Sequence, residues 1–209
     1  DEVIEKNVQM TTNLIKASSS GTHVTFFSTA LLGTVDNPKD ASDGYIAGKA
    51  ACEELWQASG LTLLLLRPVN VYGPRDRFGE GANVIPALMD RSQKEEKTLS
   101  VWGSGKQERS FLYAPDLAAV AMAFIEKGSS GVQYITPPEV LSIGDLSAQI
   151  VQIVKPELQI TFDTSHEEGA MAMPSFPLDP LLQDITWTPL SEGLQETFEW
   201  WQNTLHSSI

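Results

Sequence analysis

The chain has 209 residues, 42% of them hydrophobic and 20% charged, which is typical of a globular protein with one sizeable domain or a large domain and a small lobe. Its formal net charge of −13 argues against nucleic acid and anionic membrane surfaces as partners, because phosphate groups bind to basic faces. The sequence has a single cysteine, Cys52, and no apolar run near the ~20 residues of a membrane span, so we expect a cytoplasmic protein without disulfides.

The N-terminal third alternates helical and strand-like segments. Residues 1–18 carry apolar side chains at helical spacing, and the run SSSG ends this helix. A short apolar strand, HVTFFST, is predicted over 23–29, a second helix over 45–59 and a second buried strand over 61–67. Strand, helix and strand with continuously apolar strands indicate a parallel sheet in an α/β fold.

The rest of the chain contains shorter predicted elements. Helices are predicted over 84–92, 114–127, 143–153 and 194–205, and strands over 98–102, 110–113, 131–136 and 158–162. We interpret GSGKQE, after the strand at 98–102, as a hairpin turn, because it lacks the G-x-x-x-x-G-K-[ST] spacing of a phosphate loop. The strands at 131–136 and 158–162, with the helix between them, are expected to form a second small α/β set.

Polar residues converge at one edge of the predicted sheet. Ligands of an open α/β sheet bind outside the carboxyl ends of its strands. Ser28 ends the first strand, Tyr45 begins the second helix and Asn70 follows the second strand, so all three are expected there. Taken alone, Tyr45 and Lys49 are merely two residues one helical turn apart. Their neighbours at the sheet edge favour a chemical role for the pair.

Ser28, Tyr45 and Lys49 suit a hydride-transfer site. A tyrosine phenol titrates near ~10 and is a poor base at neutral pH. A lysine ammonium one helical turn away stabilises the phenolate, which takes a proton from a substrate hydroxyl while hydride leaves the same carbon for a cofactor. A serine hydroxyl such as that of Ser28 would hydrogen-bond the same oxygen and stabilise its developing charge.

Several short motifs in a fixed order resemble the extended short-chain dehydrogenase/reductase family, the NAD-dependent epimerase/dehydratase group that acts on nucleotide sugars. The matching runs are EKNVQMTTNL, FFSTALLG, YIAGK, LRPVNVYGPR, NVIPALM, VWGSGKQERSFLYAPDLA and WTPLSEGLQETFEWW. Together they extend from about Asn7 to Trp201. The resemblance implies an α/β fold with the C-terminal part of a Rossmann-type parallel-sheet domain and a small α/β substrate-binding lobe.

The resemblance also implies a division of the chain and a role for particular residues. The partial Rossmann domain would cover 1–70, with 98–127 returning to it, and 71–209 would be mainly the substrate-binding lobe. The implied catalytic residues are Ser28, Tyr45 and Lys49, and the implied cofactor-binding residues are Tyr45, Lys49 and Pro68. The implied substrate-binding residues are Thr29, Asn70, Asn83, Val101, Trp102 and Arg109. Among these, Asn70, Asn83 and Arg109 would hold the diphosphate of a nucleotide sugar, and the strand with Val101 and Trp102 would lie beside the nucleotide base.

The sequence departs from the family at three places. It contains no GxxGxxG turn to hold the pyrophosphate of NAD or NADP, so we expect this chain alone to bind either cofactor poorly. Thr29 and Ala30 stand where the family's dehydratases carry Asp-Glu, and Ala30 and Asn83 stand where fucose synthases carry Cys and His. The resemblance therefore implies a 4-epimerase or a 4-keto reductase. The third departure is the loop between Ser28 and Tyr45, which is shorter than usual. The alternative is a truncated, non-catalytic member that serves as a binding or structural module.

Each proposed role has a simpler structural alternative. Ser28 could cap the backbone at the strand end, Lys49 could be a solvated helix lysine and Asn70 could be a turn residue. Arg109 could form a surface ion pair with its neighbour Glu108 or with Asp116.

Two expectations concern partners and metals. The resemblance implies a homodimer that forms through the helices at 1–18 and 45–59. No metal site is expected, because His166, Glu167 and Glu168 are adjacent in sequence and lack the spacing of metal ligands.

Overall fold

The computed structural model of the protein describes residues 2–36, 38, 44–165, 171–172 and 176–206. These residues form two compact units, which are described separately. The first unit comprises Asp1–Val69, Leu117–Thr136 and Pro174–Ile185, and the second comprises Asn70–Asp116, Pro137–Met173 and Thr186–Ile209. None of the helices in the described part of the chain is long and apolar enough to cross a membrane.

A three-stranded parallel sheet forms the centre of the first unit. Its strands are β1 (His23–Phe27), β2 (Thr62–Pro68) and β7 (Gly131–Ile135), in the order β1-β2-β7. The middle strand β2 is the most deeply buried, because Leu64, Leu65 and Leu66 are covered on both faces of the sheet. The two strands predicted near the N-terminus are thereby confirmed as a parallel pair. The assignment of 131–136 to a second α/β set is wrong, since β7 pairs with β2.

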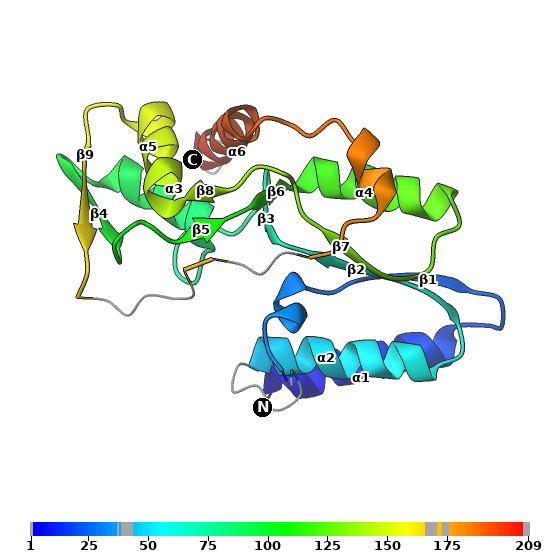
Figure 1. The fold of residues 1–209 in the computed structure, drawn as a ribbon. Coiled ribbons are helices and arrows are strands. Elements are labelled where there is room, and N and C mark those ends of the chain that lie inside the picture. Colours follow the sequence, from blue (N-terminus) through cyan, green and yellow to red (C-terminus); the bar gives the residue numbers. More distant parts are fainter. Residues whose placement is uncertain (1, 37, 39–43, 166–170, 173–175, 207–209) are drawn as a thin grey trace. The chain divides into compact units, whose positions relative to one another are not determined.

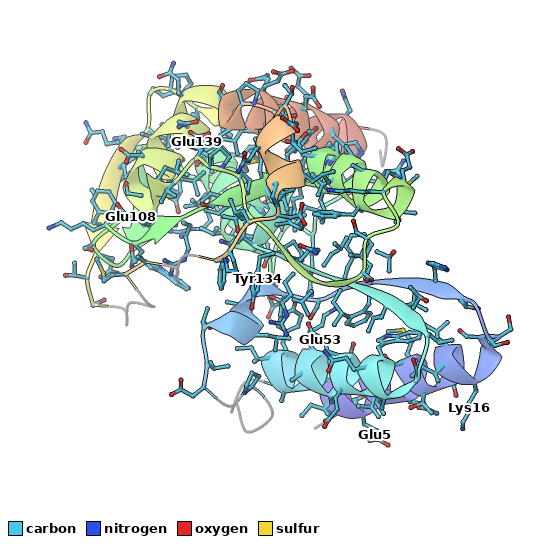
Figure 2. All side chains as sticks on the ribbon, turned by 45° about the vertical axis from the view of Figure 1, so that its right-hand side comes forward. Glu5, Lys16, Glu53, Glu108, Tyr134 and Glu139 are labelled. Carbon is cyan, nitrogen blue, oxygen red and sulfur yellow. The ribbon has the colours of Figure 1, made fainter. Side chains whose placement is uncertain are left out.

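Helices lie on both sides of this sheet (Figure 1). Helices α1 (Glu2–Ala17) and α2 (Gly44–Ala58) lie on one side and contact each other along their length. Helix α4 (Ala114–Glu126) lies on the other side. Glu5 and Lys16 are on the side of α1 that faces away from the sheet, whereas Glu53 of α2 points toward the sheet (Figure 2). The first unit therefore has the helix–sheet–helix layering of an α/β fold. The described part of the first unit also contains the 3-10 helices η1 (Ala30–Gly33) and η3 (Pro180–Asp184).

Three pairs of short strands build the second unit. These pairs are β3 (Asn70–Tyr72) with β6 (Phe111–Tyr113), β4 (Thr98–Trp102) with β9 (Gln159–Asp163), both parallel, and β5 (Glu108–Arg109) with β8 (Leu141–Ser142), antiparallel. The prediction of a hairpin at GSGKQE is wrong, because β4 pairs with β9 and the turn forms a hydrogen bond to the helix at 143–154 instead. The carbonyl of Gly105, at φ +72°, accepts a hydrogen bond from the backbone N–H of Gly144 at 2.8 Å. Residues 98–116 thus lie in the second unit, whereas 117–127 lie in the first.

The core of the second unit lies between its helices and strands. Helices α3 (Val84–Lys94) and α6 (Leu190–His206) each contact α5 (Ile143–Val154). Their apolar faces pack against side chains of the strands, among them Val101 of β4 and Phe111 of β6. The helical spacing of apolar residues predicted all three helices correctly, although α6 begins four residues before the predicted start at 194.

Two helical glycines should respond oppositely to alanine. A Cβ atom on Gly193 of α6 would lie 2.3 Å from the Oη atom of buried Tyr72, so Gly193→Ala is expected to lower the free energy of unfolding by about 1–3 kcal/mol. A Cβ atom on Gly48 of α2 would lie 3.6 Å from the Cα atom of Ile4, an ordinary contact. Gly48→Ala should therefore raise stability, by up to about 1 kcal/mol from helix propensity. Urea denaturation of both variants tests this contrast, and equal effects would contradict it.

Candidate active site

Ser28 leaves strand β1 with a buried hydroxyl. Its backbone N–H donates to the carbonyl of Leu66 at 2.7 Å, which continues the β1–β2 ladder by one residue. The side chain is only 5% exposed, and its Oγ atom has no hydrogen-bond partner among the described residues. A buried hydroxyl normally finds a partner. The structure therefore argues against the alternative that Ser28 merely caps the backbone, and the hydrogen-bonding capacity of its Oγ atom is unused among the described residues.

Thr29 turns the chain away from the sheet. Its backbone is extended, and its Oγ1 atom accepts a hydrogen bond from the N–H of Leu31 at 3.3 Å. It is the N-cap residue of η1. This hydroxyl already has a local structural role, which the sequence analysis did not predict.

Tyr45 and Lys49 lie on the first two turns of helix α2. Tyr45 is 45% exposed, and the Nζ atom of Lys49 lies 6.0 Å from the centre of its ring. The same Nζ atom donates to the carbonyl of Phe27 at 2.8 Å and lies 4.9 Å from the ring centre of Phe26. Burial lowers the pKa of Lys49, while the nearby charges of Cys52 and Glu53 oppose that shift. Lys49 is thus tied to the end of β1, which argues against the alternative of a solvated helix lysine.

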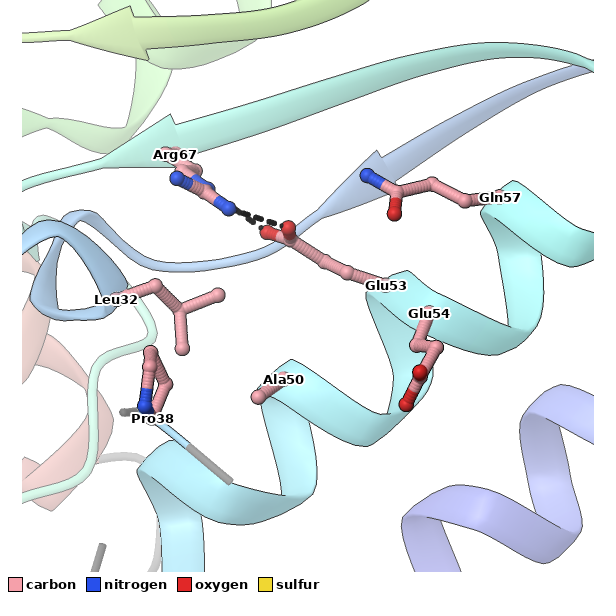
Figure 3. A pocket seen from close by; sticks show the side chains of 7 residues that line it. All are labelled: Leu32, Pro38, Ala50, Glu53, Glu54, Gln57 and Arg67. Atoms are coloured by element: carbon pink, nitrogen blue, oxygen red, sulfur yellow. Dashed lines mark hydrogen bonds and ion pairs between the residues drawn. The ribbon is translucent and has the colours of Figure 1, made fainter. Parts of the chain in front are cut away.

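A buried ion pair lies one helical turn beyond Lys49. Glu53 of α2 is 4% exposed, and its two carboxylate oxygens accept from Nε and Nη2 of Arg67 on β2 at 2.9 and 2.5 Å. Figure 3 shows the two side chains pointing toward each other and joined by hydrogen bonds, and both residues line a pocket of about 250 Å³. The Nη1 atom of Arg67 donates to the Oη atom of Tyr134 on β7 at 2.6 Å. Arg67 thereby links helix α2 to two strands.

Neither partner of this pair was predicted from the sequence, although both carry a signal. Glu53 follows Lys49 by four residues, which places the two side chains on one helix face. Arg67 interrupts an otherwise apolar strand, and a charged residue in such a position requires a partner.

The second unit contains most of the predicted substrate-binding residues. Asn70 begins β3, and its Nδ2 atom donates to the carbonyl of Ser110 at 3.0 Å, so the alternative of a turn asparagine is wrong. Asn83 is the N-cap residue of α3, but its side chain makes no capping hydrogen bond. Arg109 of β5 donates through Nη1 to the main-chain carbonyl of Glu108 at 2.7 Å. The carboxylate of Asp116, the other suggested partner of Arg109, accepts two hydrogen bonds from Thr188.

Val101 and Trp102 differ sharply in exposure. Val101 is 2% exposed and belongs to the core of the second unit, so its side chain is not available to a ligand. Trp102 is 62% exposed, and the guanidinium carbon of Arg91 lies 5.9 Å from its ring centre. Arg91 also donates to the carbonyl of Ser100 in the same strand. Arg91 was not predicted from the sequence, because a helical arginine has no local feature that marks it as a neighbour of Trp102.

The structure brings together Ser28, Tyr45 and Lys49 within the first unit. Pro68 is also in this unit, at the end of β2 and opposite Ile135 of β7. The substrate-binding residues predicted after Pro68 belong to the second unit. Among the described residues, no group of three or more His, Cys, Asp or Glu side chains could hold a metal ion. The run at 166–168, considered in that context, lies outside the described residues.

Comparison with known proteins gives consistent matches. Residues 1–144 match the NAD dependent epimerase/dehydratase family. A dTDP-4-dehydro-6-deoxy-D-allose reductase of a Streptomyces species is 31% identical over 169 residues, which are 77% of this chain and 51% of the relative. A GDP-L-fucose synthase of Sinorhizobium fredii is 34% identical over 164 residues, 74% of this chain and 51% of the relative. The chain thus spans about half the length of the curated relatives it matches.

Solved structures share the fold. A GDP-L-fucose synthetase from Naegleria fowleri bound to NADP has a TM-score of 0.79 and 21% identity, with 96% of this chain and 73% of that chain covered. A UDP-glucose 4-epimerase from Thermotoga maritima with UDP-glucose has a TM-score of 0.72 and 22% identity, with 95% and 69% covered. These similarities confirm the Rossmann-type α/β fold predicted from the sequence.

Proposed function

This chain belongs to the NAD-dependent epimerase/dehydratase family, and from that premise we propose that the protein is an NAD(P)-dependent enzyme that acts on a nucleotide sugar, as a 4-keto reductase or a 4-epimerase. Curated relatives include a 4-dehydro-sugar reductase and GDP-L-fucose synthases, whose names describe reactions of nucleotide-linked sugars. Dehydratases also occur among the relatives, but Thr29 and Ala30 replace the acidic pair expected for elimination.

One observation carries this proposal. The ammonium of Lys49 is fixed at 2.8 Å by the carbonyl of Phe27, directly before Ser28, and lies 6.0 Å from the ring centre of Tyr45. A phenol, an ammonium and a buried serine hydroxyl are thereby gathered at the carboxyl end of β1. This is the donor and acceptor set that proton transfer at a sugar hydroxyl needs.

The residues of this set suit a nicotinamide cofactor. Lys49 has three N–H donors, of which the Phe27 carbonyl takes one, and an ammonium with further donors matches the hydroxyls of a ribose. We propose Tyr45, Lys49 and Pro68 as the cofactor-binding residues of this chain. Bound NAD or NADP would supply the acceptor and donor of hydride for carbon 4 of the sugar.

The proposed proton chemistry belongs to the chain itself. In the oxidation direction, the Tyr45 phenolate takes the proton of the 4-hydroxyl as carbon 4 loses hydride and its C–O bond becomes a carbonyl. In the reduction direction, the Tyr45 phenol returns that proton to the oxygen. Ser28 donates a hydrogen bond to the same oxygen in both directions and stabilises its partial charge. Lys49 keeps positive charge beside the phenolate.

We propose that the second unit recognises the nucleotide sugar. Arg109 suits the diphosphate, because a planar guanidinium matches two phosphate oxygens. Asn70 and Asn83 supply neutral amide donors, and the exposed ring of Trp102 offers a flat face for the nucleotide base. Thr29 is proposed to contact the sugar, and the strand that holds Val101 and Trp102 is proposed to lie beside the nucleotide base.

A cytoplasmic homodimer completes the proposal. Val3, Met10 and Leu14 of α1 are large apolar side chains that are each about half exposed. Apolar side chains on one helix support its use as an interface. The partner is proposed to be a second copy, joined through helices α1 and α2, and the single buried Cys52 is in keeping with a reducing compartment.

Turnover by the full-length protein tests the proposed function. The purified protein is incubated with NADPH or NADH and 4-keto-hexoses linked to UDP, dTDP and GDP, and the oxidation of the cofactor is followed. The corresponding 4-hydroxy sugars are incubated with NAD or NADP and analysed for the 4-epimer. We expect reduction or epimerisation within one nucleotide class, and its complete absence from all three classes would reject the proposal.

A further inference from the structure

Helix α2 is held to the sheet by two polar anchors that lie one helical turn apart. The first is the hydrogen bond from Lys49 to the carbonyl of Phe27 on β1. The second is the forked ion pair between Glu53 and Arg67 on β2. Phe27 lies opposite Leu66 of β2, so Arg67 directly follows the β2 residue that pairs with the first anchor. The two anchors therefore fix both the height and the rotation of α2 over neighbouring strands.

The second anchor is built to be rigid. Both carboxylate oxygens of Glu53 are occupied by Arg67, and a two-bond fork restricts the orientation of both groups more than a single contact does. The remaining guanidinium nitrogen of Arg67 donates to Tyr134, which lies opposite Arg67 on β7. The ring of Tyr134 in turn stacks on Phe176, with centroids 4.4 Å apart and planes 5° from parallel. Arg67 therefore has little freedom to move away from Glu53.

We propose that Glu53 and Arg67 are positioning residues of the active site, in which Arg67 fixes the Glu53 carboxylate and Glu53 sets the place of Lys49, and through it of Tyr45, at the carboxyl end of β1. The catalytic meaning of this role rests on the proposed function. Neither residue needs to touch substrate. Their effect follows from geometry, because Tyr45, Lys49 and Glu53 succeed one another at four-residue steps along one face of α2.

Glu53 also acts on the charge of Lys49. The groups that face the Lys49 ammonium are the Phe27 carbonyl and Phe26 ring of β1, and Tyr45, Cys52 and Glu53 of α2. Burial lowers the pKa of Lys49, and electrostatic interactions with Cys52 and then with Glu53 oppose that shift. Removal of the Glu53 charge should favour the neutral amine. The ammonium would then be lost at a lower pH than in the wild-type protein.

Two matched charge removals on α2 separate the role of the buried Glu53 carboxylate from the effect of losing any negative charge on this helix. Glu53→Gln removes the buried carboxylate, whereas Glu54→Gln makes the same change at the next position, where the side chain is exposed. The titration of Lys49 is followed by NMR in full-length protein with ¹³C-labelled lysine, and the Lys49 signal is assigned with Lys49→Arg. The kcat and KM of each variant are measured across the same pH range.

We expect Glu53→Gln to move the Lys49 titration to lower pH and to lower kcat by about tenfold or more, the scale expected for a misplaced catalytic group. Glu54→Gln should change neither. Arg67→Lys keeps the charge but breaks the fork, so it should lower kcat while the Lys49 titration stays near that of the wild type. If Glu53→Gln does not fold, the kcat of Arg67→Lys tests the positioning role by itself.

Two results would overturn the inference. One is an unchanged Lys49 titration in Glu53→Gln, and the other is an equal shift in Glu54→Gln. If Glu53→Gln does not fold, full activity of Arg67→Lys would overturn it. Failure of the proposed function looks different, because the wild-type protein would then turn over no nucleotide sugar while the Lys49 titration would still respond to Glu53→Gln.

Discussion

Tyr45→Phe is expected to lower kcat of the full-length enzyme by about 10²–10⁴-fold, the usual contribution of a positioned general acid or base. The substitution removes only the phenolic oxygen, which is the atom proposed to exchange a proton with the sugar hydroxyl. The side chain is 45% exposed, so the fold should tolerate the change with little loss of stability. The measurement is steady-state turnover of the nucleotide sugar accepted by the wild type, together with thermal unfolding.

Tyr113→Phe is the matched control for this loss of one hydroxyl. Tyr113 is buried in the second unit, and its Oη atom donates to the carboxylate of Glu196. Burial and the Glu196 charge raise the pKa of Tyr113, so this phenol stays neutral. We expect a loss of about 1–2 kcal/mol in stability with near-normal turnover. Unchanged turnover in Tyr45→Phe would reject the proposed chemistry.

Arg67→Met should have the largest effect on stability. The substitution leaves the Glu53 carboxylate buried without either of its two hydrogen bonds, and removal of one partner from a buried ion pair costs about 3–5 kcal/mol. The Arg67 side chain is 18% exposed, so water could partly solvate the carboxylate and place the loss toward the lower value. Urea denaturation of wild type and variant gives the difference in free energy of unfolding.

The double variant Glu53→Leu/Arg67→Met distinguishes two causes of lost stability, namely an unpaired buried charge and the loss of side-chain packing. It removes both charges together, and such replacements are often neutral or even stabilising. We expect its stability to lie within about 1 kcal/mol of the wild type, well above Arg67→Met. Equal destabilisation of the single and double variants would mean that side-chain shape, not unpaired charge, accounts for the loss. The double variant should still have low turnover, because the second anchor of α2 is absent.

Part of the candidate site could be predicted because its signals are local. The four-residue step from Tyr45 to Lys49 and the place of Ser28 at a strand end are readable in the sequence, and the structure gathers the three in one unit. Glu53 and Arg67 were missed because their partnership joins a helix to a strand 14 residues further along. Arg91 was missed for the same reason, since its neighbour Trp102 lies on another element.

The spacing of apolar side chains along the chain predicted the type and approximate ends of most helices and strands, and the order of the motifs marked the family. The pairing of β7 with β2, the pairing of β4 with β9 and the buried Ser28 hydroxyl without a partner among the described residues became evident only in the folded protein. The difference lies in how far apart along the chain the interacting residues are. Helix and strand formation depend on residues a few positions apart, whereas strand pairing and buried ion pairs depend on which distant segments pack together.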